Sequence, residues 1–105
     1  MILVTTDEVS GRKTIEVFGL VWGVAVRTRS VSADLVSTMK NLVGGEIHEY
    51  TALIAQSRAQ AVDRMVEQAK AMGANAVVGI RFSTSECMTG AAEVLAYGTA
   101  VRLEE

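Results

Sequence analysis

The feature that most constrains the fold is the run from Gly44 to Phe82, which predicts one long helix followed directly by a buried strand. Within it, polar and apolar side chains recur at helical spacing on opposite sides. The polar set is Gln56, Gln60, Asp63, Glu67 and Lys70; the apolar set is Ala55, Ala59, Val62, Val66 and Ala69, widened by Ile54, Ala61, Met65 and Met72. Gly73 fits a left-handed C-cap, and the β-branched run from Ala76 to Phe82 is typical of a strand. The run therefore predicts a helix lying on a sheet.

The strongest strand signal before this run is the segment from Thr14 to Val26. It is apolar on both alternating sets of side chains, which favours a strand covered on both faces. Gly19 and Gly23 in its interior indicate a bulge, a bend or the close approach of another backbone. A monomer with a single helical layer would leave one of its two apolar sets facing water, which favours assembly. The alternative is a compact monomer in which a second, short helix covers that face.

Two shorter segments complete a sheet of about four strands. Residues 2–5 predict a short first strand, joined to the next by a hairpin through the polar turn at Ser10 to Lys13. The last strand is expected from Glu93 to Leu103, with Val94, Ala96, Gly98 and Ala100 forming a small-residue face suited to close packing. Residues 85–90 are polar and predict a loop.

A second, shorter helix is expected between the strand ending at Val26 and the double glycine Gly44-Gly45. Ser32 is its candidate N-cap, and apolar side chains follow at three- and four-residue spacing: Leu35, Val36, Met39, Leu42 and Val43. Residues 46–50 then link to the long helix, for which Thr51 is the candidate N-cap. The chain of 105 residues shows no internal boundary, so we expect one domain spanning 1–105.

Composition excludes several classes of function. A net charge of −2 gives no broad attraction to nucleic acid. No apolar run is long enough to cross a bilayer, and Met1 to Val4 lacks the features of a signal peptide. The single cysteine, Cys87, agrees with a reducing compartment. We therefore expect a cytoplasmic protein that binds neither nucleic acid nor membrane.

Four motifs together resemble the YbjQ-like family: Gly44-Gly45-Glu46, Arg58, the run GANAVVGIRF (73–82) and the run EVLAYGTAV (93–101). This family of small bacterial and archaeal proteins carries a heavy-metal-binding label but no assigned activity. The resemblance spans nearly the whole chain. It implies an α/β (α+β) subunit whose antiparallel sheet carries the long helix in a dodecin-like arrangement. It also implies assembly into a homopentameric ring, which would cover the second apolar face.

Metal binding is weakly supported by the residues themselves. Zinc and softer metals take several histidine or cysteine ligands, and the chain offers one of each, His48 and Cys87. A site would need ligands from several subunits or carboxylates such as Glu46, Glu49 and Glu86. Glu86 also disfavours the thiolate form of Cys87, which argues against a catalytic cysteine. We therefore predict no tightly bound transition metal in the isolated subunit, and no glycine pattern identifies a cofactor.

Arg58 is the most informative charged residue, because the predicted helix places it on the apolar side. A guanidinium there needs a carboxylate, and Glu46 or Glu93 is the expected partner, with the Tyr97 hydroxyl nearby. Two function classes remain. The favoured one is a non-enzymatic ring that binds a small ligand or ion at subunit boundaries lined by Arg58, Glu46, Glu93 and Tyr97. The alternative is a small acid/base enzyme using Glu46, Glu93 and Arg58, beside the metal-binding role of the family label.

Overall fold

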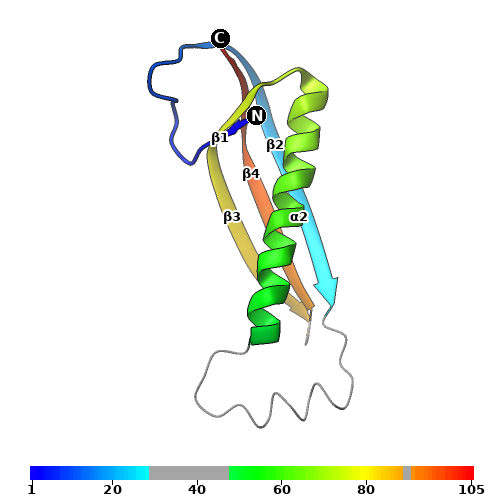
Figure 1. Ribbon diagram of the computed structural model, residues 1–105. Helices are drawn as coiled ribbons and strands as arrows, with labels where there is room; N and C mark the ends of the chain where they lie inside the picture. Colours follow the sequence, from blue (N-terminus) through cyan, green and yellow to red (C-terminus); the bar gives the residue numbers. More distant parts are fainter. Residues whose placement is uncertain (29–47, 89–90) are drawn as a thin grey trace.

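The computed structural model describes residues 1–28, 48–88 and 91–105 (Figure 1). One helix and four strands make up this part of the chain, so the fold is α+β. In chain order they are β1 (Ile2–Leu3), β2 (Thr14–Thr28), α2 (His48–Met72), β3 (Ala76–Met88) and β4 (Ala91–Leu103). The strands form a single sheet in the order β1-β3-β4-β2, and α2 lies lengthwise across one face of it (Figure 1). The short helix expected at 32–43 and the residue Glu46 lie outside the described residues.

The sheet is mixed, not antiparallel throughout as expected. β4 runs antiparallel to both of its neighbours, β2 and β3, whereas β1 runs parallel to β3. The expected hairpin between the first two strands is therefore wrong, because β1 and β2 lie on opposite edges of the sheet. The edge of β3 binds the N-terminal segment instead: the Ile2 N–H donates to the Asn75 carbonyl at 3.1 Å, and the Val4 N–H donates to the Val77 carbonyl at 3.0 Å.

The long helix ends as predicted but begins earlier. Gly73 has φ of 91° and closes a Schellman motif, in which its N–H donates to the Lys70 carbonyl and the Ala74 N–H donates to the Ala69 carbonyl. At the other end, the helix already includes His48, so Thr51 is an internal residue and not the N-cap.

The helix face that meets the sheet agrees only in part with the predicted one, which included Ala61, Met65 and Ala69. Four residues spaced by four are completely buried: Ser57, Ala61, Met65 and Ala69. Ala55 and Ala59, which were expected on the apolar face, are exposed. Ser57 is tolerated in the core because its hydroxyl donates to the Leu53 carbonyl at 2.8 Å, which satisfies the buried polar group within the helix.

The two glycines inside β2 have separate structural reasons. At Gly19, φ is 114° and the pairing with β4 shifts register, which identifies a β-bulge. At Gly23, an added Cβ would lie 2.0 Å from the Ala61 carbonyl oxygen and 2.6 Å from the Met65 nitrogen. The backbone of α2 therefore rests almost directly on β2. The bulge at Gly19 and the close approach of the helix backbone at Gly23 are both among the alternatives predicted from the sequence.

Strands β3 and β4 are longer than predicted. The expected loop at 85–90 is wrong for its first part, because β3 continues through Glu86 and Cys87 to Met88, and β4 begins at Ala91. The small-residue face of β4 is confirmed: Val94, Ala96 and Ala100 belong to the core cluster that also contains Ala61 and Met65 of the helix.

Candidate functional site

Among the described residues, those that cover the face of the sheet opposite α2 lie at one end of it. There, Val78, Val101 and Leu103 form a second buried cluster, and Ile2, Val4 and Val9 of the N-terminal segment pack against it. Farther along the strands, large apolar side chains on this face are exposed to solvent: Leu20, Trp22, Val26 and Tyr97. We call this uncovered part the open face.

The open face follows directly from strand alternation. Val21, Gly23 and Ala25 of β2 are buried toward the helix, so the residues between them point the other way. On β4, burial of Val94 and Ala96 in the helix-side core likewise directs Leu95 and Tyr97 to the open face. The same two strands thus present small residues to the helix and large ones to solvent.

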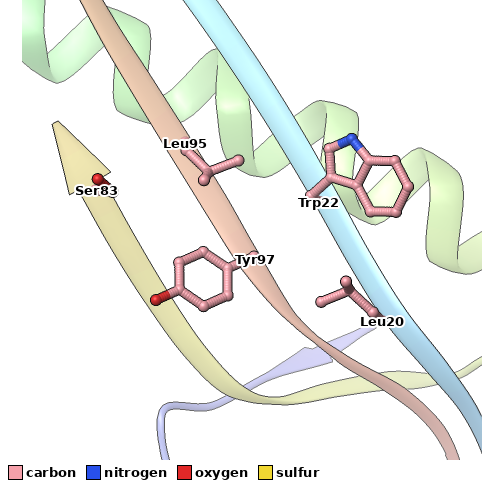
Figure 2. Close-up of a pocket in the computed structure, with 5 residues that line it drawn as sticks. All are labelled: Leu20, Trp22, Ser83, Leu95 and Tyr97. Carbon is pink, nitrogen blue, oxygen red and sulfur yellow. The ribbon is translucent and has the colours of Figure 1, made fainter. Parts of the chain in front are cut away.

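A shallow hollow of about 520 Å³ lies at the centre of the open face. Its lining residues are Leu20 and Trp22 on β2, Leu95 and Tyr97 on β4, and Ser83 on β3. Figure 2 shows these side chains on the side of the strands that faces away from α2, which passes behind the sheet. The hollow is largely apolar, with the Tyr97 hydroxyl and Ser83 as its polar groups.

A row of three paired residues crosses three strands at the hollow, and two of them, Trp22 and Tyr97, line it. Trp22 lies directly opposite Tyr97 in the β2–β4 register, and Tyr97 lies opposite Arg81 in the β3–β4 register. The Arg81 Nη1 group donates to the carbonyls of Thr5 and Ile80, each at 2.8 Å, so the guanidinium is held by backbone oxygens. An aromatic pair with a fixed cation at one end can stack on, and orient, a planar or acidic group.

The predicted ligand-binding residues do not all meet in one subunit. Glu93 and Tyr97 lie on the open face of β4, on either side of Leu95. Arg58 projects from the helix and is exposed, and its guanidinium carbon lies 5.7 Å from the centre of the Phe82 ring. Phe82 pairs with Ala96, a helix-side residue, so the sheet separates Arg58 from Glu93. The expected burial of Arg58 on the apolar side of the helix is wrong.

The two weak metal candidates lie on different elements. His48 is the first residue of α2, and Cys87 is the penultimate residue of β3. Across residues 1–28, 48–88 and 91–105, no group of three or more histidine, cysteine, aspartate or glutamate side chains is placed to hold a metal ion. Nor is any helix in this part of the chain long and apolar enough to cross a membrane.

Sequence reasoning missed Arg81 and Ser83 as site residues. Arg81 lies in the run from Ala76 to Phe82, which predicts a buried strand and no site, and Ser83 follows that run directly. Arg81 is the one charged residue in the run. The sequence signal for Arg81 is its charge, which directly follows a stretch rich in β-branched residues.

Comparison with known proteins identifies the family. Residues 1–104 match the family model YbjQ_1, described as "Putative heavy-metal-binding". A UPF0145 protein of Methanoculleus marisnigri is 52% identical over 103 residues, covering 98% of this chain and 96% of that protein. A UPF0145 protein of Clostridioides difficile is 50% identical over 105 residues, covering 100% and 94%.

A solved structure supports the fold. The crystal structure of a protein of unknown function from Pediococcus pentosaceus superposes with a TM-score of 0.69, covering 99% of this chain and 98% of that one. At 15% identity, this likeness concerns the fold alone. The sequence relatives and the family model agree, and the chain belongs to the YbjQ-like UPF0145 family.

Proposed function

We propose that this chain is a non-enzymatic subunit of a homo-oligomeric ring, a pentamer by its family resemblance, which binds a small ligand or ion where subunits meet. The observation that carries the proposal is the open face. Trp22 is 49% exposed, Leu20 61% and Val26 55%, and all three stand on one strand. A contiguous apolar surface of this kind marks an interaction site, and closed symmetry is the usual arrangement of identical subunits.

The ligand part of the proposal rests on the residues around the hollow. Trp22 and Tyr97 offer neighbouring aromatic surfaces, and the Tyr97 hydroxyl, Ser83 and Glu93 add polar groups on the same face. A neighbouring subunit laid over this face would turn the shallow hollow into an enclosed boundary site. Mostly apolar lining with a few polar groups is the usual character of small-ligand sites.

A non-enzymatic role is favoured over acid/base chemistry by the placement of the charges. The acid/base alternative needs Arg58 beside a carboxylate, and the sheet lies between Arg58 and Glu93. Arg81, on the open face, is held by neutral carbonyl oxygens. No carboxylate paired with a cation is therefore present at the hollow among the residues that the structure describes.

The test is the mass of the particle in solution. Native mass spectrometry and light scattering at micromolar concentration should give a multiple of the 11.2 kDa subunit, five by our proposal. Trp22→Lys should dissociate it, because burying a lysine at an apolar interface is costly. The matched control is Met72→Lys, which replaces another exposed apolar residue at the far end of α2 and should leave the mass unchanged.

The chain contains one tryptophan, so its fluorescence reports directly on the open face. Dilution that dissociates the wild-type particle should shift the Trp22 emission to the red. A wild-type monomer at micromolar concentration, or a Trp22→Lys particle of unchanged mass, contradicts the proposal.

A further inference from the structure

A second cleft lies along the outer edge of β2 and shares Val26 with the open face. Its volume is about 550 Å³, and it runs between the end of β2 and the first half of α2. The lining residues are Val26, Arg27, Leu53, Gln56, Gln60 and Arg64. Unlike the hollow on the open face, this cleft is mostly polar, and it contains two arginines. We call it the edge cleft.

Arg27 enters the cleft from the helix-facing side of β2 and is held in place by two glutamines. Its Nε group donates to the Gln60 Oε1 atom at 3.3 Å, and its Nη1 group donates to the Gln56 Oε1 atom at 3.0 Å. Gln56 and Gln60 are one helical turn apart, so both side chains reach the same guanidinium. The arginine is half-buried, and its position is fixed by two separate contacts.

Arg64 enters the same cleft from the next turn of the helix. Its Nη1 group donates to the Val24 carbonyl, which points outward from the edge of β2. One turn farther, the Gln68 Oε1 atom accepts a hydrogen bond from the Trp22 N–H at 2.7 Å. A stripe of four side chains on α2, at positions 56, 60, 64 and 68, therefore follows the β2 edge.

These contacts leave the cleft with surplus donors. Each guanidinium has five N–H groups, of which Arg27 uses two and Arg64 uses one in these bonds. The oxygens of both glutamine amides already accept from Arg27, so their NH₂ groups remain as donors. The side-chain oxygens of Gln56 and Gln60 and the Val24 carbonyl each accept from a guanidinium, so a ligand entering the cleft meets donors and positive charge.

The two positive charges are also without close negative partners in the described parts of the chain. Asp63 and Glu67 flank Arg64 along the helix, yet no carboxylate that the structure describes lies within 4.0 Å of either guanidinium. A carboxylate partner in bidentate contact would compensate the charge of a guanidinium. Here the protein supplies neutral acceptors that orient the guanidinium groups and leave the charge available.

We infer that the edge cleft is a binding site for an oxyanion, a phosphate or carboxylate group held by Arg27 and Arg64 together. Phosphate and carboxylate groups each present two oxygens that one guanidinium can bind at the same time. The amide NH₂ groups of Gln56 and Gln60 add neutral donors. The site is separate from the hollow on the open face and does not depend on Trp22 or Tyr97.

The test titrates the full-length protein with inorganic phosphate and, separately, with succinate, against sodium chloride at equal ionic strength. Binding is followed by calorimetry and by the Nε–Hε nuclear magnetic resonance signals of Arg27 and Arg64. We expect saturation at one site per chain by at least one oxyanion, with chloride giving no saturation. Arg27→Gln and Arg64→Gln should each weaken that binding at least about tenfold, since a charge-assisted hydrogen bond is lost. Arg64→Lys should retain part of it.

The charge control is Lys70→Gln, which removes one positive charge from the same helix outside the cleft and should leave binding unchanged. Circular dichroism confirms that each variant is folded. Equal, unsaturable responses to phosphate, succinate and chloride would mean general counterion attraction and overturn the inference. So would equal weakening by Lys70→Gln. If neither anion binds while the arginine variants change the mass of the particle, the cleft receives a carboxylate of a second copy, and the small-anion proposal fails.

Discussion

The two faces of the sheet are built from the same strands and differ in nearly everything else. On the helix side, Val21, Ala25 and Ala96 are fully buried, and alanine is the commonest residue of the core cluster there. On the open face, their immediate neighbours Trp22, Val26 and Tyr97 are large and exposed. Small side chains let the helix backbone approach the sheet, whereas large ones provide area for a partner. The difference shows that one strand can serve the fold with one set of residues and an interface with the other.

The face of the sheet opposite α2 also differs along its own length. Near the chain ends, the N-terminal segment covers it with Ile2, Val4 and Val9. Beyond that segment, no described element covers Leu20, Trp22 or Tyr97. The covered end behaves as a second core, and the open face extends along β2 as far as Val26. Three predictions test this difference between the two faces.

The largest expected effect is at Gly23, where the helix side has no spare room. Gly23→Ala would place a Cβ 2.0 Å from the Ala61 carbonyl oxygen, so the helix must move away from β2. We expect the free energy of unfolding to fall by about 3 kcal/mol, measured by urea denaturation. Gly19→Ala is the control, because its Cβ meets nothing within 4 Å and only its φ of 114° is strained. Its cost should be about 1 kcal/mol. Equal losses would show that the helix does not rest on Gly23.

A smaller effect separates the two faces on a single strand. Val21→Thr puts a hydroxyl into the helix-side core and should cost about 2 kcal/mol, because the new polar group is buried among apolar side chains. The same change at Val26, which is 55% exposed, should cost under about 0.5 kcal/mol in dissociated subunits. The measurement is urea denaturation at low protein concentration. A comparable loss at Val26 would mean that the open face is covered even in the single subunit.

The smallest expected effect concerns metal, which would be another way to hold subunits together. We predict no stoichiometric transition metal in untagged protein by elemental analysis. Adding zinc, copper or nickel should shift the melting temperature by no more than about 1 °C, because one imidazole and one thiol cannot complete a tetrahedral shell. Bound metal that disappears in a His48→Ala, Cys87→Ala double variant would contradict this prediction.

Local sequence patterns predicted the parts of the fold that depend on neighbouring residues. The helix–strand run, its Gly73 cap and the small-residue face of β4 follow from periodicity and turn chemistry. The phase of the helix was harder to predict, because alanine is nearly neutral in a hydrophobic pattern. Ala55 and Ala59 look as apolar as Ala61, and Ser57 looks polar. Contact with Gly23, a residue distant in sequence, decides which of them is buried.

Long-range pairing explains the other differences. A polar turn after residues 2–5 favours a hairpin, and nothing local indicates that the first strand will join β3. The prediction of the candidate site failed for the same reason. Arg58 and Glu93 were expected to form an ion pair, but they lie on opposite faces of the sheet. Helical spacing places Gln56 and Gln60 on the polar face of the helix. It cannot show that both accept hydrogen bonds from Arg27, which lies near the end of β2.

The pairing of β2 with β4 has a consequence for synthesis. Thr14 pairs with Leu103 and Thr28 with Ala91, so an early segment finds its partner only in the last strand made. At roughly 5 to 20 residues per second, β2 emerges from the ribosome several seconds before β4 exists. During that interval, Leu20, Val21 and Trp22 have no strand beside them, and pairing over such sequence distances is intrinsically slow. Until β4 has been made, the apolar segment of β2 therefore has no strand to pair with and is open to non-native contacts.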